Sequence, residues 1–398
     1  MSNNIYIQGL GIISAIGNNM QECLDSLQNS ADGVAKMHYL QSAHKDELPV
    51  AEVKKSNKEL AEMAEMPASL TRTALLSTIA AKEALADAGI ESITDWKIGF
   101  ISANTVGGMD KTEDFYKDFL QDASKGKLRD VVNHECGSAT EIVAEQLGAT
   151  DYITTISTAC SSSANSIFFG ARLIRNGVLD IAIAGGADAL TKFTLNGFNT
   201  LMILDKEPCK PFDENRKGLN LGEGAAYVVL VSERVRKTLS KQPYCKLSGY
   251  CNANDAYHQT ASSPDGTGSY LAMKGALEKS GLQLTDIDYI NLHGTGTQNN
   301  DSAEGTAIKR LFDPHYPKLS STKAYTGHTL GASGGVEAVF ASLAIKHGII
   351  YPNLRFETQI ADQPFAPETQ LIRQDVKNVL SNSFGFGGNC SSLIFSKV

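Results

Sequence analysis

One cysteine stands among side chains too small to pack around it, in the segment STACSSSANS at 157–166. A buried structural cysteine behaves as a small hydrophobe, whereas Ser, Thr and Ala leave space beside the sulfur. Cys160 follows the apolar stretch 151–157 and precedes SSSANSIFFGARLIRNG, which we predict to be a helix. At a helix N-terminus, free N–H groups and the helix dipole lower a thiol pKa from about 8.5. We therefore predict that Cys160 is a nucleophile.

A histidine ends the apolar strand predicted in NLHGTGTQNND, at 291–301. His293 precedes Gly-Thr-Gly-Thr, so its ring should emerge over an accessible backbone, where Thr295 and Thr297 could bind a polar ligand. Taken alone, a satisfied surface histidine is an equal alternative.

A second histidine lies in STKAYTGHTLGASGG, where Lys323 and His328 are five residues apart. The small residues at 331–335 lack the GxxxxGK[ST] pattern of a phosphate-binding loop. We expect this tract to pack closely against the helix after Cys160.

Glycines surround an aromatic residue in SNSFGFGGNCSS, at 381–392. They permit backbone angles that expose N–H groups, as an oxyanion hole requires. Phe384 and Phe386 are either plain core residues or, in such a mobile loop, a gate. One cysteine and two histidines on separate loops favour acyl chemistry in which the cysteine holds the acyl group.

The elements that must position these loops repeat along the chain. Segments 84–108 and 276–300 share one layout: the end of a helix, a glycine, a polar stretch, an apolar strand and a Gly/Thr-rich loop. Small-residue helix starts recur at 160–177 and 331–348, and the strand NIYIQGLGII has a counterpart at 244–253. Strands alternating with helices predict an α/β fold of two similar halves, with the chemistry on loops that converge between them.

Composition excludes several classes of protein. The 398 residues carry a net charge of −8, which gives no electrostatic footprint for nucleic acid. The 7 cysteines show no metal-ligand spacing and favour a reducing compartment. No apolar stretch is long enough to span a membrane and no export signal is visible, so we expect a cytoplasmic protein. The sequence also lacks a dinucleotide fingerprint.

In order and spacing, the motifs resemble those of the β-ketoacyl-acyl carrier protein synthases, the elongating condensing enzymes of the thiolase superfamily. The resemblance covers essentially the whole chain. The segments that carry it are TACSSSANSI, KPFDENRKGLNLGEGAA, NDAYHQTASSPDG, HGTGTQNNDSAEG, KAYTGH and SNSFGFGG. It implies a thiolase-like fold in five αβαβα layers, with a half at 1–243 that carries the cysteine and a half at 244–398 that carries both histidines. It further implies a dimer, formed with a second copy or with a related ketosynthase subunit.

The resemblance also implies a mechanism. Cys160 accepts an acyl group from the phosphopantetheine of acyl carrier protein, and the N–H groups of Cys160 and Phe386 stabilise the oxyanion. His293 and His328 then promote decarboxylation of malonyl-carrier protein and stabilise the enolate, which attacks the thioester. Neither a metal nor a bound cofactor is implied.

Supporting residues follow from the same resemblance. Lys323 resembles the lysine that orients the second histidine and Glu304 its buried carboxylate partner, with an ordinary ion pair as the alternative. Thr295 and Thr297 match threonines that contact the pantetheine arm. The aromatic and aliphatic residues expected to line the acyl pocket are Phe384, the gate Phe386, Val106 and Phe198.

The sequence departs from the family pattern in three places. The common GFGGTN reads GFGGNC, so Asn389 and Cys390 change the hydrogen bonding beneath the gate loop. ACSSSANS replaces ACATGAH, and the helix that usually docks the carrier protein is acidic until Arg72. Docking then falls to other basic residues, such as Lys206, Lys210 or Arg172, or needs a dedicated carrier. These departures favour a specialised branch, such as polyene or aryl-polyene synthesis.

Three alternatives remain. A non-catalytic chain-length factor, which shapes a heterodimer, would lack the nucleophile. A cysteine acyl hydrolase that uses Cys160 and His293 leaves His328, Lys323 and the gate unexplained. A biosynthetic thiolase would need a second active cysteine, for which Cys390 is the candidate.

Overall fold

Two sets of five strands with the same internal order form the frame of the protein. The computed structural model describes residues 4–90 and 92–398. The first set runs β3-β2-β4-β5-β1 and the second β8-β7-β11-β12-β6. They meet where β1 pairs with β6 through Tyr6–Lys246 and Ile7–Cys245. The strands are β1 (Ile5–Ser14), β2 (Ile98–Ala103), β3 (Tyr152–Ile156), β4 (Ile181–Asp188), β5 (Gly224–Ser232), β6 (Cys245–Asn254), β7 (Tyr289–Asn291), β8 (Lys318–Ser320), β11 (Asn378–Phe384) and β12 (Asn389–Ser396), with β9 (Ile349–Ile350) and β10 (Ile372–Arg373) forming a separate pair.

Strand directions confirm the predicted repeat. In the first set β2 is parallel to β3 and β4, whereas β5 is antiparallel to β4 and β1. In the second set β7 is parallel to β8 and β11, whereas β12 is antiparallel to β11 and β6. The strands therefore correspond in pairs, β1 with β6 and β2 with β7. The proposed boundary between 243 and 244 stays a prediction, and residues 1–3 and 91 lie outside the described residues.

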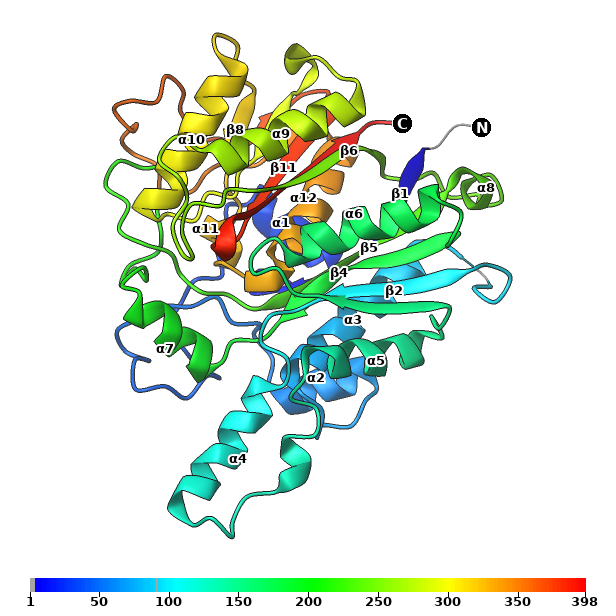
Figure 1. The fold of residues 1–398 in the computed structure, drawn as a ribbon, viewed down its shortest axis with the longest axis vertical. Helices are drawn as coiled ribbons and strands as arrows, with labels where there is room; N and C mark the ends of the chain where they lie inside the picture. The colour runs from blue at the N-terminus through cyan, green and yellow to red at the C-terminus, as the bar shows by residue number, and fades with distance from the viewer. Residues whose placement is uncertain (1–3, 91) are drawn as a thin grey trace.

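The helices complete five layers (Figure 1). Helices α6 and α12 lie against each other between the two sets of strands, while α3 and α5 cover the outer face of the first set and α9 and α10 that of the second. The helices are α1 (Met20–Gln28), α2 (Asn57–Ala64), α3 (Arg72–Asp87), α4 (Met109–Gln121), α5 (Cys136–Leu147), α6 (Ser162–Arg175), α7 (Lys192–Thr200), α8 (Glu233–Arg236), α9 (Thr267–Ser280), α10 (Gln298–Phe312), α11 (Lys323–Thr326) and α12 (Ser333–His347).

Small residues let the two central helices approach each other, as the sequence predicted. A Cβ atom at Gly334 would lie 2.7 Å from the backbone nitrogen of Ala164 in α6, closer than a side chain permits. The N–H of Gly335 donates to Ser163 Oγ at 2.8 Å. This close contact joins the segment after Cys160 to the segment after His328.

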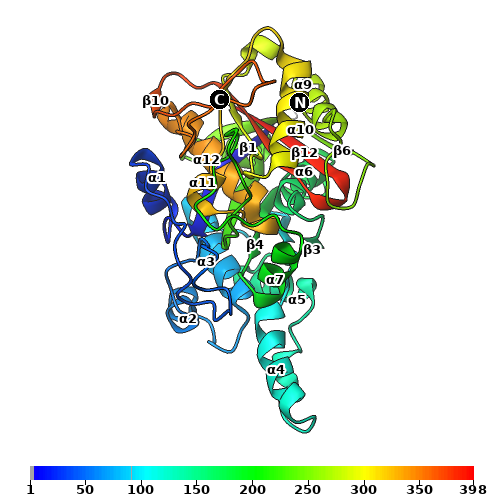
Figure 2. The same cartoon turned by 90° about the vertical axis from the view of Figure 1, so that its left-hand side faces the viewer.

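Helix α4 projects from the body of the protein (Figures 1 and 2). None of its residues is buried, although it carries the aromatic residues Tyr116 and Phe119. Leu120, Leu128 and Val132, in and after this helix, are 67%, 73% and 70% exposed. In the part of the chain that the structure describes, no helix is both long and apolar enough to cross a membrane.

Candidate active site

Cys160 occupies a tight turn between β3 and α6. Ala159 has a φ of 54°, a left-handed conformation that is rare for residues other than glycine. Ser162 stabilises the turn: its Oγ accepts the N–H of Thr158 at 2.8 Å and donates to the carbonyl of Ala159 at 2.5 Å. A strained turn between a strand and a helix is the arrangement expected of a nucleophile.

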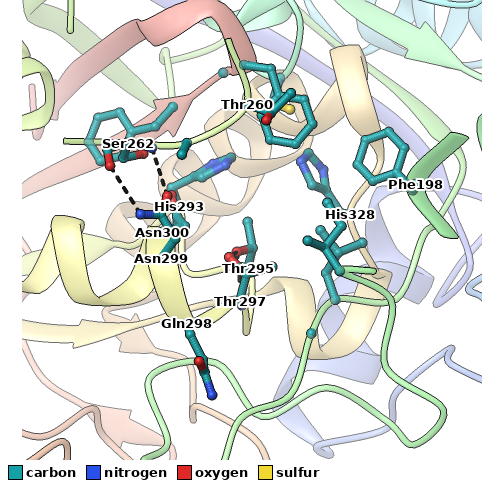
Figure 3. Close-up of a pocket in the computed structure, with 18 of the residues that line it drawn as sticks. Phe198, Thr260, Ser262, His293, Thr295, Thr297, Gln298, Asn299, Asn300 and His328 are labelled. Atoms are coloured by element: carbon teal, nitrogen blue, oxygen red, sulfur yellow. Dashed lines mark hydrogen bonds between the residues drawn. The ribbon is translucent and has the colours of Figure 1, made fainter. Parts of the chain in front are cut away.

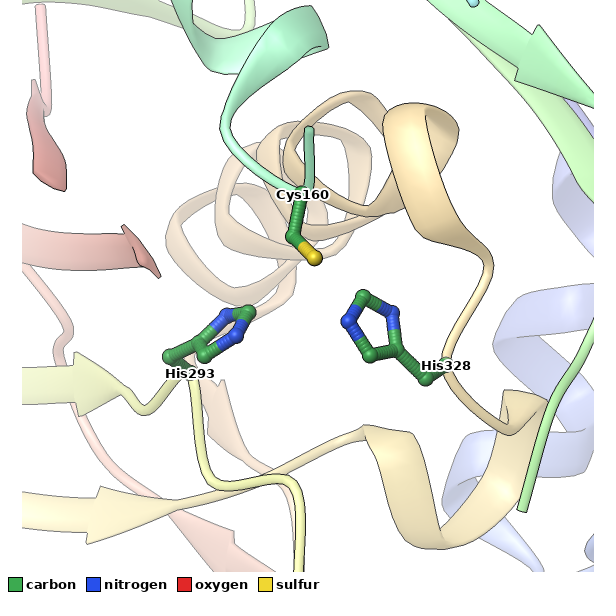
Figure 4. Close-up of side chains that lie close together, drawn as sticks. All are labelled: Cys160, His293 and His328. Carbon is green, nitrogen blue, oxygen red and sulfur yellow. The ribbon is translucent and has the colours of Figure 1, made fainter. Parts of the chain in front are cut away.

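His293 follows β7, and His328 follows α11. Their rings face each other edge to face, with centroids 5.5 Å apart. One side-chain ligand atom from each of Cys160, His293 and His328 lies within 4.8 Å of the others, and all three residues are buried (Figure 4). The structure thus brings together the three residues predicted to be catalytic.

Lys323 contacts the first histidine, not the second, which corrects the prediction. Its Nζ lies 3.3 Å from His293 Nδ1 and forms a short, buried ion pair with Glu337 Oε1. His328 Nδ1 instead accepts the N–H of Leu330 at 3.1 Å, and Ser333 Oγ lies 3.0 Å from it. The lysine therefore orients His293, whereas backbone and hydroxyl groups hold His328.

The predicted pairing of Lys323 with Glu304 is wrong. Glu304 accepts the N–H groups of His293 and Gly294 at 2.9 and 2.8 Å and the amide of Asn382 at 3.0 Å, so its role is to hold the histidine loop. The actual partner, Glu337, is a carboxylate in a helix whose residues are buried from Ser333 to Ile345. A lone acid in such an apolar helix is a signal that sequence reasoning missed.

Burial reverses the expected effect on the nucleophile. Cys160 is 5% exposed, and desolvation raises the pKa of its thiol to about 11. The charge of Lys323 and the N–H of Phe386 only partly offset this rise. The resting residue is a neutral thiol, contrary to the prediction of a lowered pKa, because the helix terminus does not compensate for loss of water.

Both imidazoles are neutral as well. Desolvation, followed by the charge of Lys323, holds the pKa of each histidine well below its usual range. Each Nδ1 accepts a hydrogen bond, from the Lys323 ammonium in His293 and from the Leu330 N–H in His328. We therefore assign the proton of each ring to Nε2, which leaves two N–H donors near the cysteine.

A cavity of about 290 Å³ leads to these groups (Figure 3). The residues that line it include Cys160, both histidines, Thr295, Thr297, Phe198, Phe384 and Phe386, all of which the sequence singled out. Hydroxyl and amide groups near its entrance, from Ser262, Gln298, Asn299 and Asn300, were missed.

Val106 does not line the cavity, in contrast to the other predicted wall residues. It packs with Phe198 against an apolar cluster that includes Leu190, Leu195 and Leu330. The ring of Phe198 therefore stands at the cavity wall, while Val106 contributes to the cluster beside it.

Asn389 lies at the centre of a polar network beneath the gate loop, where the sequence departs from the family pattern. Its Oδ1 accepts from Ser161 Oγ at 2.7 Å, Asn165 Nδ2 at 2.9 Å and Asn252 Nδ2 at 2.7 Å. These hydrogen bonds connect Asn389, at the end of the gate loop, to the turn that carries Cys160. Cys390 is also buried and lines the same cavity, and desolvation raises its pKa to about 12.

The side chain of Arg72 is not available on the surface to bind a carrier protein. Its guanidinium is buried and donates to both oxygens of Glu223, at 2.9 and 2.6 Å. Lys206 and Lys210 pair with Glu47 and Glu357, at 3.8 and 3.2 Å. The docking surface stays a prediction.

The chain is similar in sequence to proteins of known function. The relative from Staphylococcus aureus (strain MRSA252), "3-oxoacyl-[acyl-carrier-protein] synthase 2", is 33% identical over 416 residues, covering 100% of this chain and 99% of that protein. A mitochondrial 3-oxoacyl-[acyl-carrier-protein] synthase of Arabidopsis thaliana is 39% identical over 255 residues, which cover 61% of this chain and 55% of the relative.

Solved structures share the whole fold. "The ishigamide ketosynthase/chain length factor" matches with a TM-score of 0.93 at 27% identity, covering 99% of both chains. A ketosynthase in complex with its chain length factor from Xenorhabdus doucetiae matches with a TM-score of 0.87 at 32% identity, covering 99% of this chain and 98% of that one. The expected thiolase-like fold is confirmed.

Family descriptions match both halves: "Beta-ketoacyl synthase, N-terminal domain" over residues 2–235 and "Beta-ketoacyl synthase, C-terminal domain" over residues 244–357. Together with the relatives above, these matches identify the reaction class as condensation by an acyltransferase, and they do not favour a chain-length factor. The chain belongs to the β-ketoacyl synthase family and is a condensing enzyme of the 3-oxoacyl-acyl carrier protein synthase type.

Proposed function

We propose that Cys160 carries the growing acyl chain as a thioester, and that His293 and His328 stabilise the enolate made from a malonyl thioester. The observation that carries this proposal is the position of two neutral imidazoles beside the sulfur, each with Nδ1 already occupied. Two outward N–H groups suit an enolate oxygen, which needs hydrogen-bond donors and no strong base.

In the first step the Cys160 sulfur attacks the carbonyl of an acyl thioester on acyl carrier protein. The new C–S bond forms a tetrahedral oxyanion, which collapses as the bond to the pantetheine sulfur breaks, and the thiol proton ends on the leaving pantetheine thiolate. The backbone N–H groups of Cys160 and Phe386, both of which lower the pKa of the Cys160 thiol, stabilise the tetrahedral oxyanion. Because the resting thiol is neutral, substrate must enter before the proton leaves.

In the second step malonyl-carrier protein loses CO₂. The electron pair of the broken C–C bond forms an enolate, whose oxygen accepts hydrogen bonds from His293 and His328. Its carbon attacks the Cys160 thioester, and the C–S bond breaks to release a β-ketoacyl-carrier protein. One proton from solvent restores the thiol. Loss of CO₂ generates the carbanion, so the proposal requires no metal and no resident cofactor.

The entrance of the cavity suits a polar, extended arm. Thr295 and Thr297 form a pair of hydroxyls, with their oxygens 2.9 Å apart, along the route to Cys160. Exposed Lys217 and Met202, the latter 87% exposed, border the opening and offer a cation and an apolar contact to an acidic carrier. The similarity to enzymes named for acyl carrier protein supports this choice of substrate carrier.

We further propose that the protein works as a dimer with a related ketosynthase subunit. Two solved structures that it resembles are a ketosynthase/chain length factor and a ketosynthase in complex with its chain length factor. The uncovered apolar residues of α4 and the edge strand β3, where Ile153 is 41% exposed, would be buried in such an interface.

The departures at Asn389, at Cys390 and in the segment after Cys160 lead us to place the enzyme in specialised polyene or polyketide-type synthesis. A cytoplasmic location is part of the proposal, because the free cysteines, Cys160 among them, suit a reducing compartment.

The deciding experiment is mass spectrometry of the acyl group trapped on the enzyme after incubation with acyl-carrier protein. A single acyl adduct on Cys160, unchanged in Cys390→Ala, is expected. An adduct on Cys390 would instead favour the thiolase alternative, and its rapid loss to water with no condensation product would favour the hydrolase.

A further inference from the structure

A buried carboxylate joins two loops of the active site but takes no part in the mechanism described above. Asp188, the last residue of β4, is 0% exposed. Its Oδ1 accepts the N–H of Thr105 at 2.8 Å and of Val106 at 3.2 Å, and its Oδ2 accepts Thr105 Oγ1 at 2.7 Å and the N–H of Gly331 at 2.7 Å. Asp188 therefore connects the loop after β2 to the loop after His328.

The contact with Gly331 leads directly to the histidine. Two consecutive backbone N–H groups bind different partners. The N–H of Leu330 donates to His328 Nδ1 at 3.1 Å, and the N–H of Gly331 donates to Asp188 Oδ2. The peptide between these two residues thus lies between the imidazole and the carboxylate.

That peptide has an unfavourable conformation. Leu330 has a φ of 52°, which a branched side chain adopts only when its surroundings impose it. A Cβ atom at Gly331 would lie 2.7 Å from Asp188 Oδ2, so only glycine allows this approach to the carboxylate. The Gly331 N–H thus binds Asp188 directly after the strained residue beside His328.

We propose that Asp188 is a positioning residue for His328: by binding the Gly331 N–H, it holds the Leu330 N–H on His328 Nδ1 and so keeps the Nε2 proton directed at the substrate. The inference rests on the proposed function of His328. It gives each imidazole its own buried orienting group, Lys323 for His293 and Asp188, acting through the backbone, for His328.

The electrostatic surroundings agree with a charged carboxylate at neutral pH. Burial raises the pKa of Asp188 to about 6, but its four hydrogen-bond donors limit the rise. Its charge also raises the pKa of the Cys160 thiol. In Asp188→Asn the amide NH₂ would face N–H donors, so one of the two loops must move.

The test is a double-mutant cycle on the decarboxylation of malonyl-carrier protein by the full-length enzyme. Asp188→Asn should lower kcat on the order of tenfold, with little change in KM, because Asp188 acts through the Gly331 N–H on His328 and not on the carrier. In a His328→Ala background the same substitution should have almost no further effect. Gly331→Ala should reproduce the loss and serves as the second variant if Asp188→Asn fails to fold.

Tyr227→Phe is the matched control, because Tyr227 is an equally buried polar residue, bonded to Ser77 and Ser102, and lies outside the cavity. Tyr227→Phe should lower the free energy of unfolding without changing kcat for decarboxylation in either background. If Asp188→Asn lowers kcat by the same factor in the wild-type enzyme and in the His328→Ala background, the inference is overturned. If His328→Ala itself leaves decarboxylation intact, the proposed function fails instead.

Discussion

The ring of Phe386 stacks on the ring of Phe198, with centroids 5.7 Å apart and planes inclined by 19°. The first ring belongs to the glycine-flanked loop before β12 and the second to α7. Both line the cavity of Cys160, and Phe198 packs on the apolar cluster behind it. The stack therefore closes the cavity on the side where an acyl chain would find apolar surroundings.

Opening this stack should change which chains are accepted. Phe198→Ala removes an aromatic contact of about 1 kcal/mol without touching the backbone of the gate. We expect the KM to fall for acyl-carrier substrates with longer chains. The ratio of the rates for the preferred and the less preferred chain length should therefore decrease severalfold. Competition between two acyl-carriers, read by mass spectrometry, measures this preference, and an unchanged preference would contradict the role of the stack.

Removing the nucleophile should separate the two half-reactions. Cys160→Ala should lower condensation by at least about a thousandfold, while decarboxylation of malonyl-carrier protein continues, because the enolate donors remain. Adding His293→Ala or His328→Ala should then reduce the release of CO₂ to a small residual rate, because each change removes one of the two enolate donors. His315→Ala, a change at an exposed histidine, is the control. Chain extension retained by Cys160→Ala would refute the mechanism.

The pH dependence of alkylation should report the pKa of the buried Cys160 thiol. With a pKa of about 11, roughly one Cys160 thiol in a thousand is ionised at pH 8, and the fraction rises about tenfold with each pH unit. In the apo enzyme, alkylation of Cys160 by iodoacetamide should therefore increase steadily from pH 7 to 10. A plateau below pH 8 would mean that the helix terminus and Lys323 lower the pKa after all.

The buried pair of Lys323 and Glu337 should behave as one unit. Lys323→Met leaves a carboxylate buried without its cation, which costs about 3 to 5 kcal/mol of unfolding free energy. Lys323→Met combined with Glu337→Leu should recover most of this loss, because neither charge remains. The matched double variant with Glu304→Gln should not recover it. Urea denaturation distinguishes the outcomes, and recovery with Glu304→Gln would restore the partner first expected from the sequence.

The apolar side of α4 should matter for assembly and not for the chemistry itself. Leu120→Lys places a charge at a position that is 67% exposed in the single chain, so the fold should tolerate it. If this helix is covered by a second subunit, the substitution should shift sedimentation toward the monomer or block capture of the partner subunit. Leu284→Lys, at a residue 38% exposed on another surface, is the control. Equal behaviour of the two variants would place the interface elsewhere.

Local sequence was sufficient for the residues whose neighbours reveal them. Cys160 among small side chains, His293 before Gly-Thr-Gly-Thr and Gly334 in a tract too small for an ordinary core each carry their signal within a few positions. The repeat of strand and helix patterns likewise predicted the two matching sets of strands, because hydrophobic periodicity depends on nearby residues.

Contacts between segments that are distant in the chain could not be predicted from the local sequence. The sequence led us to pair Lys323 with Glu304, and only the packing of α12 between the two sets of strands brought Glu337 to the lysine. The same packing joined Asp188 to Gly331, 143 positions later in the chain. The pKa of Cys160 also depended on this packing, because exclusion of water, which no motif records, outweighs the helix terminus. The sequence by itself determined which groups could react, whereas the tertiary structure decided their partners and protonation, because both depend on distance and solvent access.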